Sequence, residues 1–279
     1  MSGAGNLFTM IDNRTKLLNP EQAALFAPQL CVATQVTGRK TEGLLLLQNS
    51  NDDELDFEVL FFNPDGSSSM MCGNGARCAI RFAQHIGAIA TDNSSVRFRM
   101  AGELYSAVSA IGDIEVSFPP PSEIRRSQVI SAGALSLTVD YINVSSDHVI
   151  LEEDYLRMQC IEDSQKFSFL SLAPLIRSHN IFPKGANVNL YRVREDVVYL
   201  QTFERGVEAI TGACGTGALA TAVSIWLRNQ QAADTFSIIP PSGEKLEVKV
   251  IHNAANEITA LALRGDAKIL GTATKQIPD

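Results

Sequence analysis

The motif Cys72-Gly73-Asn74-Gly75-Ala76 occurs in a second version, Cys214-Gly215-Thr216-Gly217-Ala218, 142 positions later (214 minus 72). Each copy has a cysteine, a glycine, a small polar residue, a second glycine and an alanine, and an apolar run at helical spacing follows it. Glycine lets the backbone turn tightly and approach a ligand closely. We therefore expect each cysteine to stand at the start of a helix.

The repeat extends beyond the two motifs. Asn63 lies nine positions before Cys72 (72 minus 63), and Glu204 lies ten positions before Cys214 (214 minus 204). Both residues come just after a predicted strand. A duplicated α/β unit is the simplest account of this pattern.

A proline run separates the two copies. Pro119-Pro120-Pro121 cannot continue a strand ladder and favours a stiff, extended connection. We therefore predict an N-terminal half at residues 1–118 that carries Cys72 and is completed by the C-terminal segment 266–279. The predicted C-terminal half, residues 119–265, carries Cys214.

Composition narrows the classes of partner. The chain has 279 residues, of which 45% are hydrophobic, and this is enough for a sizeable core. Its 23 basic residues against 31 acidic ones leave no basic stripe for nucleic acid or an anionic membrane. The sequence has no secretory signal at its start and no apolar run long enough to span a membrane. We expect a soluble cytoplasmic protein that has small-molecule chemistry or protein partners.

The five cysteines are an odd number and widely spread, which favours free thiols over a disulfide framework. For Cys31, Cys78 and Cys160 we favour the role of small buried hydrophobic residues. A zinc site lacks the Cys-x-x-Cys spacing and a nearby histidine, so we predict no metal. A nucleotide phosphate loop lacks its Lys-Ser/Thr pair.

The start of a helix suits acid/base chemistry by a thiol. Its exposed N–H groups bind anions, and its positive end favours the thiolate form of a neighbouring cysteine. Two such thiols on opposite faces of one carbon could remove a proton from one side and return one from the other. The helix starts would also stabilise the charge that develops on a bound carboxylate, so no cofactor is needed as an electron sink.

The extended motifs are Cys72-Gly-Asn-Gly-Ala-Arg-Cys78, Glu204-Arg205-Gly206, Ala213-Cys214-Gly-Thr-Gly217, Gly5-Asn6, Phe62-Asn63-Pro64-Asp65-Gly66, Asn143-Val144 with His148, and Phe182-Pro183 with Asn187-Val188-Asn189. In these motifs the chain resembles the diaminopimelate epimerase family of cofactor-independent amino-acid epimerases. The resemblance implies an α+β fold of two pseudo-symmetric α/β halves, each a central helix wrapped by mostly antiparallel strands. It also implies an active site in the cleft between the halves and a homodimer.

The resemblance assigns a role to each matching position. Cys72 and Cys214 would be the catalytic acid/base pair, and His148 and Glu204, with Asn6, would surround the reacting centre. The reacting carboxylate would receive backbone N–H groups from Gly73, Asn74, Gly75, Gly215 and Thr216. The distal amino-acid end of the substrate would be held by Asn63, Asn187 and Arg205. An arginine can bind a carboxylate through two parallel hydrogen bonds.

The chain departs from the family pattern near the expected substrate. Ser2 and Leu7 stand for a His and an Asp, and Ile210 stands for a Glu. The usual Gly-Asn-Pro-His reads Ser145-Ser146-Asp147-His148, which places Ser146 at a substrate-contacting asparagine.

These observations lead to three hypotheses. The first is epimerisation of LL-2,6-diaminopimelate to the meso form, for lysine and peptidoglycan precursors. The second is the same two-cysteine chemistry on another amino acid, and the third is a non-catalytic anion-binding protein.

Overall fold

The structure is a computed structural model that describes residues 1–15, 17–68, 71–91, 95–109, 112–159, 168–229 and 232–274. It is a sheet-rich α+β fold with few helices, as the sequence predicted. The chain forms two compact units. Unit 1 comprises Met1–Ser117 and Arg264–Asp279, and unit 2 comprises Phe118–Leu263.

Unit 1 is built on a mixed sheet whose strands follow the chain in order from β1 to β7. The pairs β2/β3 and β4/β5 are parallel, and the other pairs among these strands are antiparallel. Its elements are β1 (Ser2–Gly3), β2 (Asn6–Asp12), α1 (Pro20–Leu30), β3 (Gly43–Gln48), β4 (Phe57–Phe62), α2 (Gly73–His85), β5 (Ser95–Met100), β6 (Glu103–Ser109) and β7 (Asp113–Phe118).

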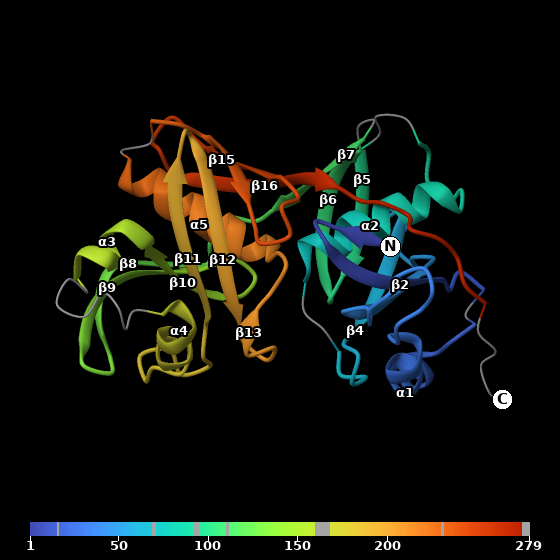
Figure 1. Cartoon of the computed structure of the whole chain (residues 1–279). Coiled ribbons are helices and arrows are strands. Elements are labelled where there is room, and N and C mark those ends of the chain that lie inside the picture. Colours follow the sequence, from blue (N-terminus) through green and yellow to red (C-terminus); the bar gives the residue numbers. More distant parts are fainter. Residues whose placement is uncertain are drawn as a thin grey trace. The chain divides into compact units, whose positions relative to one another are not determined.

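Helix α2 is the central helix of unit 1. It lies against β1, β2 and β3 (Figure 1). Its residues from Gly73 to Ile80 are all buried. The residues Leu44 to Leu47 of β3 are all apolar and fully buried, as expected for a strand that is covered on both faces. Leu44 and Leu46 pack into the cluster that contains α1, while Leu45 is the side chain nearest to Gly75 of α2.

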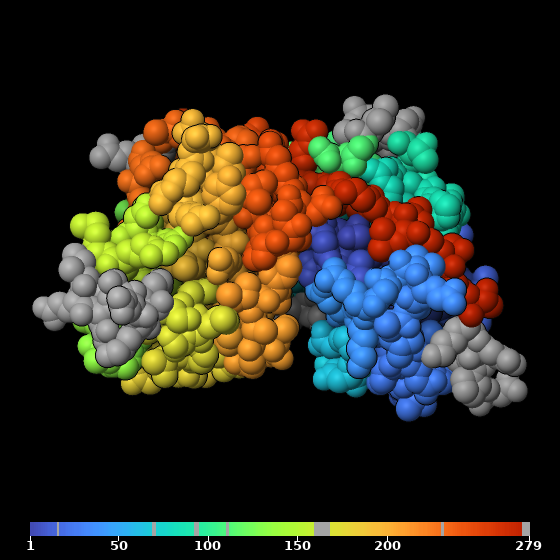
Figure 2. Space-filling view, viewed as in Figure 1, coloured from blue at the N-terminus to red at the C-terminus, as the bar shows by residue number. Residues whose placement is uncertain are grey.

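The end of the chain returns to unit 1. Strand β16 (Ile258–Asp266) begins in unit 2, and from Arg264 onward its residues belong to unit 1. Ser2 and Lys268 exchange two backbone hydrogen bonds of 2.8 Å. Figure 2 shows this red C-terminal segment running over the surface of unit 1.

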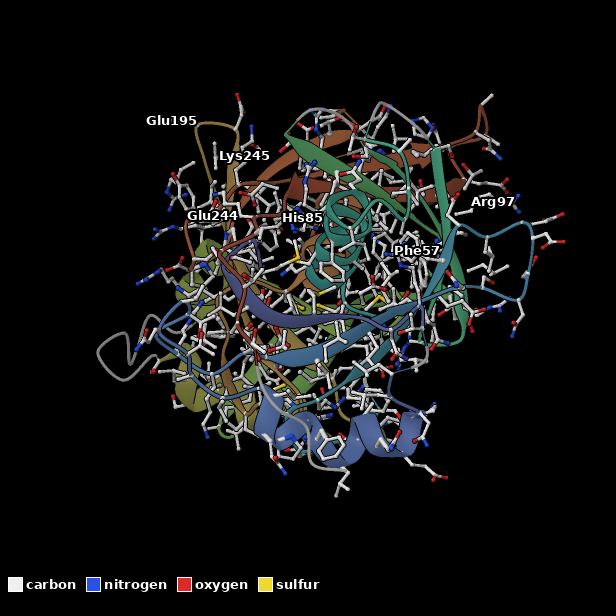
Figure 3. The ribbon with its side chains drawn as sticks, turned by 90° about the vertical axis from the view of Figure 1, so that its right-hand side faces the viewer. Phe57, His85, Arg97, Glu195, Glu244 and Lys245 are labelled. Atoms are coloured by element: carbon white, nitrogen blue, oxygen red, sulfur yellow. The ribbon has the colours of Figure 1, made fainter. Side chains whose placement is uncertain are left out.

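The alternation of β5 and of its neighbour β4 sorts their side chains between core and solvent. Phe57 is buried and stacks on Phe98, with ring centroids 5.5 Å apart. Arg97, one position from Phe98, forms an exposed ion pair with Glu54. Figure 3 shows Phe57 inside unit 1 and Arg97 at its outer edge. The period of two in the sequence therefore sets the burial of these strands.

Unit 2 has the strand order β15-β14-β12-β11-β10-β9-β8, and β13 pairs with β12. The pairs β10/β11 and β12/β14 are parallel, whereas β11/β12 and β14/β15 are antiparallel. Strands β2 to β6 of unit 1 show the same sequence of pairings. The elements of unit 2 are β8 (Glu123–Ala132), β9 (Leu135–Asn143), β10 (Asp147–Glu152), α3 (Glu153–Gln159), α4 (Phe169–Arg177), β11 (Asn187–Arg194), β12 (Val197–Glu204), β13 (Ala209–Ile210), α5 (Gly215–Arg228), β14 (Thr235–Ile239) and β15 (Leu246–His252).

Helix α5 has the place in unit 2 that α2 has in unit 1. It lies against β9, β10, β11 and β15, and it is buried from Gly215 to Trp226. The small residues along α5 let the surrounding strands approach it closely. Among the helices that the structure describes, none has the length and apolar character to cross a membrane.

Candidate active site

Cys72 and Cys214 are the N-cap residues of α2 and α5, which confirms that each cysteine stands at a helix start. Their backbone angles are nearly identical, with φ −125° and ψ 112° at Cys72 and φ −122° and ψ 109° at Cys214. Each Sγ accepts a backbone N–H, from Gly75 or Gly217, at 3.4 Å. The positive end of each helix is thus directed at a sulfur atom, where it stabilises negative charge.

Within unit 2, a series of hydrogen-bonding contacts connects Cys214 with Thr216, His148 and Ser146. The Thr216 hydroxyl lies 3.6 Å from Cys214 Sγ and 3.0 Å from His148 Nε2. Ser146 Oγ lies 2.8 Å from the same Nε2 and donates to Thr216 Oγ1 at 3.2 Å. Because Thr216 Oγ1 accepts from Ser146, its own proton is available to the sulfur.

Asn189 fixes the tautomer of His148. Its Nδ2 donates to the Val149 carbonyl at 3.0 Å and faces His148 Nδ1 at 3.1 Å. A carbonyl only accepts, so the amide nitrogen is assigned, Nδ1 must accept from it, and the imidazole proton lies on Nε2. Complete burial lowers the pKa of His148 to about 3. In this geometry His148 is a neutral hydrogen-bond donor.

At the start of α2, unit 1 has a hydrogen-bond network that contains two charged side chains, Arg77 and Glu42. The fully buried Arg77 donates from Nη2 to Asn74 Oδ1 at 2.7 Å, and Asn74 Nδ2 donates to Asn6 Oδ1 at 2.6 Å. Asn6 Nδ2 in turn donates to the carboxylate of Glu42. Burial lowers the pKa of Arg77, and the nearby thiols Cys78 and Cys72 oppose that shift. The two helix starts therefore share a backbone geometry but differ in charge.

Two of the three residues expected at the distal end of a substrate lie together in unit 2. Asn187 Oδ1 accepts the backbone N–H of Arg205 at 2.9 Å, and Asn187 Nδ2 donates to the Asp147 carbonyl at 3.2 Å. Arg205 Nη1 also forms an ion pair of 3.2 Å with Asp147. The third residue, Asn63, lies in unit 1 and donates to Ser67 Oγ at 2.9 Å within its own loop.

Glu204 ends β12, and its carboxylate accepts a hydrogen bond from Thr211. Ile210, which stands for a glutamate in the family pattern, is partly buried against the core of unit 2. The amide N–H groups of the first helical turn have no acceptor within a helix. Gly73, Asn74, Gly215 and Thr216 occupy this turn. The N–H of Gly75, the fifth backbone donor expected from the sequence, is donated to Cys72 Sγ.

Four residues of these networks are given no role by the sequence, although the first three stand in its motifs: Asn189, Asp147, Arg77 and Glu42. Only Asn189 had a usable signal, because it alternates with Asn187 and so points to the same face of its strand. Arg77 and Glu42 are charged residues that would ordinarily be read as exposed.

The remaining described cysteines are buried, as predicted. Burial raises the pKa of the Cys78 thiol to about 12 and also raises that of Cys31. Cys160 lies outside the described residues. Across the described residues, no group of three or more His, Cys, Asp or Glu side chains could hold a metal ion.

A family model described as diaminopimelate epimerase matches residues 1–121 and 157–270 of this chain. The chain belongs to the diaminopimelate epimerase family. This membership places it among the isomerases that act as epimerases. One relative is the diaminopimelate epimerase of Aquifex aeolicus, which is 35% identical over 258 residues that cover 89% of this chain and 88% of the relative.

Solved structures show how widely this fold is used. A hydroxyproline epimerase from Agrobacterium vitis, solved with bound trans-4-hydroxy-L-proline, has a TM-score of 0.68 at 15% identity. The match covers 95% of this chain and 87% of the epimerase. A phenazine biosynthesis protein of the PhzF family from Bacillus anthracis has a TM-score of 0.71 at 12% identity, with 95% and 92% coverage. At these identities the likeness concerns the fold alone.

Proposed function

We propose that this protein interconverts LL-2,6-diaminopimelate and meso-diaminopimelate without pyridoxal phosphate, for the synthesis of lysine and peptidoglycan precursors. The observation that carries the proposal is the pair of matching N-caps, each with a cysteine sulfur that receives a backbone N–H of its helix. The chain also shares its family with curated relatives named for this activity.

The proposed reaction has two bases and no added electron sink. One thiolate takes the α hydrogen as a proton and becomes a thiol, and the bond electrons are delocalised toward the substrate carboxylate. The other thiol then gives its proton to the opposite face of the α carbon and becomes a thiolate. This reaction requires both sulfur atoms, of Cys72 and Cys214, to reach one α carbon.

Backbone N–H groups stabilise the intermediate in this scheme. The first turns of α2 and α5 offer them from Gly73, Asn74, Gly215 and Thr216 to the reacting carboxylate, whereas the Gly75 N–H is directed at Cys72 Sγ. Fixed donors of this kind stabilise the charge as it develops, because they need no reorganisation. Asn6, His148 and Glu204 then support the reacting centre, and Asn63, Asn187 and Arg205 bind the distal end of the substrate. We further propose a cytoplasmic homodimer.

Deuterium exchange tests this function. Reduced protein incubated in D2O with LL-diaminopimelate should introduce deuterium at the α carbon with no cofactor added, which proton NMR measures. Either Cys72→Ser or Cys214→Ser should lower turnover by roughly 10²-fold or more, because a hydroxyl is a far weaker base than a thiolate. Cys31→Ala serves as the control, since Cys31 is buried in the α1 cluster and has no proposed role.

Two results would contradict the proposal. One is the absence of exchange by folded, reduced wild-type protein. The other is an activity of Cys72→Ser and Cys214→Ser equal to that of the Cys31→Ala control.

A second candidate is racemisation or epimerisation of another amino acid by the same chemistry. Ser146 favours it, because its hydroxyl bonds to His148 and Thr216 where the family pattern has a substrate-contacting asparagine. A screen of L-amino acids for loss of optical rotation separates the two candidates. If only diaminopimelate is converted, the second candidate is excluded.

A further inference from the structure

Asp147 occupies a position where the family pattern has proline, and it lies in residues 122–156, which the family model does not match. Its carboxylate holds three hydrogen bonds. Oδ1 accepts from the Tyr141 hydroxyl at 2.5 Å and from Asn143 Nδ2 at 3.2 Å, and Oδ2 accepts from Arg205 Nη1 at 3.2 Å. These three donors stabilise a negative charge on Asp147 beside Arg205.

Tyr141, which donates to the Asp147 carboxylate, is itself held in place by two aromatic contacts. Tyr141 stacks on Phe182 with ring centroids 5.5 Å apart, and the Arg125 guanidinium lies 3.9 Å from the centre of the Tyr141 ring. Burial opposes ionisation, but the Tyr141 hydroxyl and the Arg205 cation together hold the pKa of Asp147 below its usual range. Asp147 is therefore a carboxylate at neutral pH.

The Arg205 guanidinium forms its hydrogen bonds to the described residues through a single nitrogen, Nη1. Besides Asp147, Nη1 donates to the carbonyl oxygens of Lys184 at 2.9 Å and Gly185 at 3.0 Å. Every guanidinium hydrogen bond from Arg205 to the described part of the chain comes from Nη1. The edge formed by Nε and Nη2 is the one that can bind a carboxylate through two parallel bonds. Asp147 thus neutralises Arg205 without occupying that edge.

We propose that Asp147 is a specificity-determining residue, which together with Arg205 selects a distal substrate group that carries both an ammonium and a carboxylate. The carboxylate would bind Arg205, and the ammonium would lie beside Asp147. This inference rests on the proposed function, in which Arg205 binds the distal end.

The physical basis is charge matching. A ligand with a distal carboxylate alone brings a second negative charge to Asp147 and competes with it for Arg205. A ligand with a distal ammonium alone leaves the Nε and Nη2 edge of Arg205 unused. A group with both charges satisfies both residues, and this difference in affinity is what specificity requires.

The test compares two ligands by calorimetry, diaminopimelate as an equilibrated mixture of its LL and meso isomers and racemic 2-aminopimelate, which lacks the distal amino group. Wild-type protein should bind 2-aminopimelate at least about tenfold more weakly, as expected for the loss of one charged contact. Asp147→Asn should reduce this ratio to about threefold or less. Asp154→Asn is the matched control, because Asp154 forms an exposed ion pair of 2.9 Å with Arg194.

Arg205→Gln gives a reciprocal measurement that does not depend on the folding of Asp147→Asn. It leaves Asp147 without its cation, so L-lysine should gain affinity relative to 2-aminopimelate by at least about tenfold. The proposal is overturned if Asp147→Asn or Arg205→Gln leaves its ratio within twofold of wild type, or if Asp154→Asn changes the ratio as much as Asp147→Asn.

Binding and deuterium exchange separate this inference from the proposed function. Exchange with diaminopimelate and an unchanged binding ratio would count against the role of Asp147 alone. Altered ratios in a protein that shows no exchange would count against the two-cysteine reaction alone. Failure of folded wild-type protein to bind diaminopimelate would overturn both.

Discussion

Replacing Gly217 with alanine should damage unit 2, whereas the same change at Gly75, its counterpart in unit 1, should not. A Cβ atom at Gly217 would lie 2.5 Å from Asn189 Oδ1 and 2.9 Å from Thr202 Oγ1. A Cβ at Gly75 would lie no closer than 3.4 Å to any neighbour, the nearest being a methyl group of Leu45. The first value is a clash and the second is ordinary packing.

The magnitude follows from what Asn189 must give up. It is fully buried and holds bonds to His148, to the Val149 carbonyl and to Thr202, so it has little freedom to move. Losing about three such bonds at about 1 kcal/mol each, against a gain of about 1 kcal/mol for alanine over glycine in a helix, leaves a loss of about 2 kcal/mol. Gly75→Ala keeps only the gain.

Thermal unfolding followed by circular dichroism measures the difference. For a protein of this size about 2 kcal/mol corresponds to a fall of roughly 4–8 °C in Tm. Gly217→Ala should show this fall together with reduced deuterium exchange, because Asn189 no longer fixes the His148 tautomer. Gly75→Ala should melt at or slightly above the wild-type temperature. Equal melting temperatures for the two variants would refute the reasoning.

Two further predictions concern charge. The pKa of His148 is about 3 when folded against its usual 6.5, so the unfolded chain binds an extra proton between these values. The contribution of His148 to the free energy of unfolding should be fully present above pH 6.5 and should fall by up to about 1.4 kcal/mol per pH unit toward pH 3. Urea unfolding at a series of pH values should therefore show a weaker pH dependence of this free energy for His148→Gln than for wild type. An equal pH dependence in the two proteins would exclude His148 as its source. Arg77→Leu, which copies Leu219 of α5, should raise the pH midpoint of Cys72 alkylation by iodoacetamide, because it removes a cation that interacts with Cys72. Arg77→Lys should preserve the midpoint, and an unshifted Arg77→Leu would show that this cation does not act on Cys72.

The helix starts and most strands could be predicted from the sequence because their signals are local. Glycine after Cys72 and after Cys214 permits the same turn in both places, and the apolar runs that follow specify a buried helix. The alternation of Val96, Phe98 and Met100 and that of Leu246, Val248 and Val250 is likewise typical of strands, and these residues lie in β5 and β15. Strand β8 has a weak hydrophobic pattern because most of its residues are exposed or half-buried, so alternation does not reveal it.

The charge states of the site could not be predicted, because they depend on residues far apart in the chain. The parallel register of β10 and β11 places His148 opposite Asn187 and brings Asn189 to the imidazole. Asp147 and Arg205 are 58 positions apart and meet because β10, β11 and β12 are neighbours. No local pattern contains this information.

Local sequence is sufficient to predict the helix that begins at each copy of the cysteine motif and the family to which the chain belongs. Turn formation and helix capping depend on a few adjacent residues, so these features can be predicted without knowing the rest of the fold. The neutral state of His148, the burial of Arg77 and the ion pair between Asp147 and Arg205 follow from the tertiary structure and not from local sequence. Burial and strand register set these properties, and both arise from the packing of the whole unit.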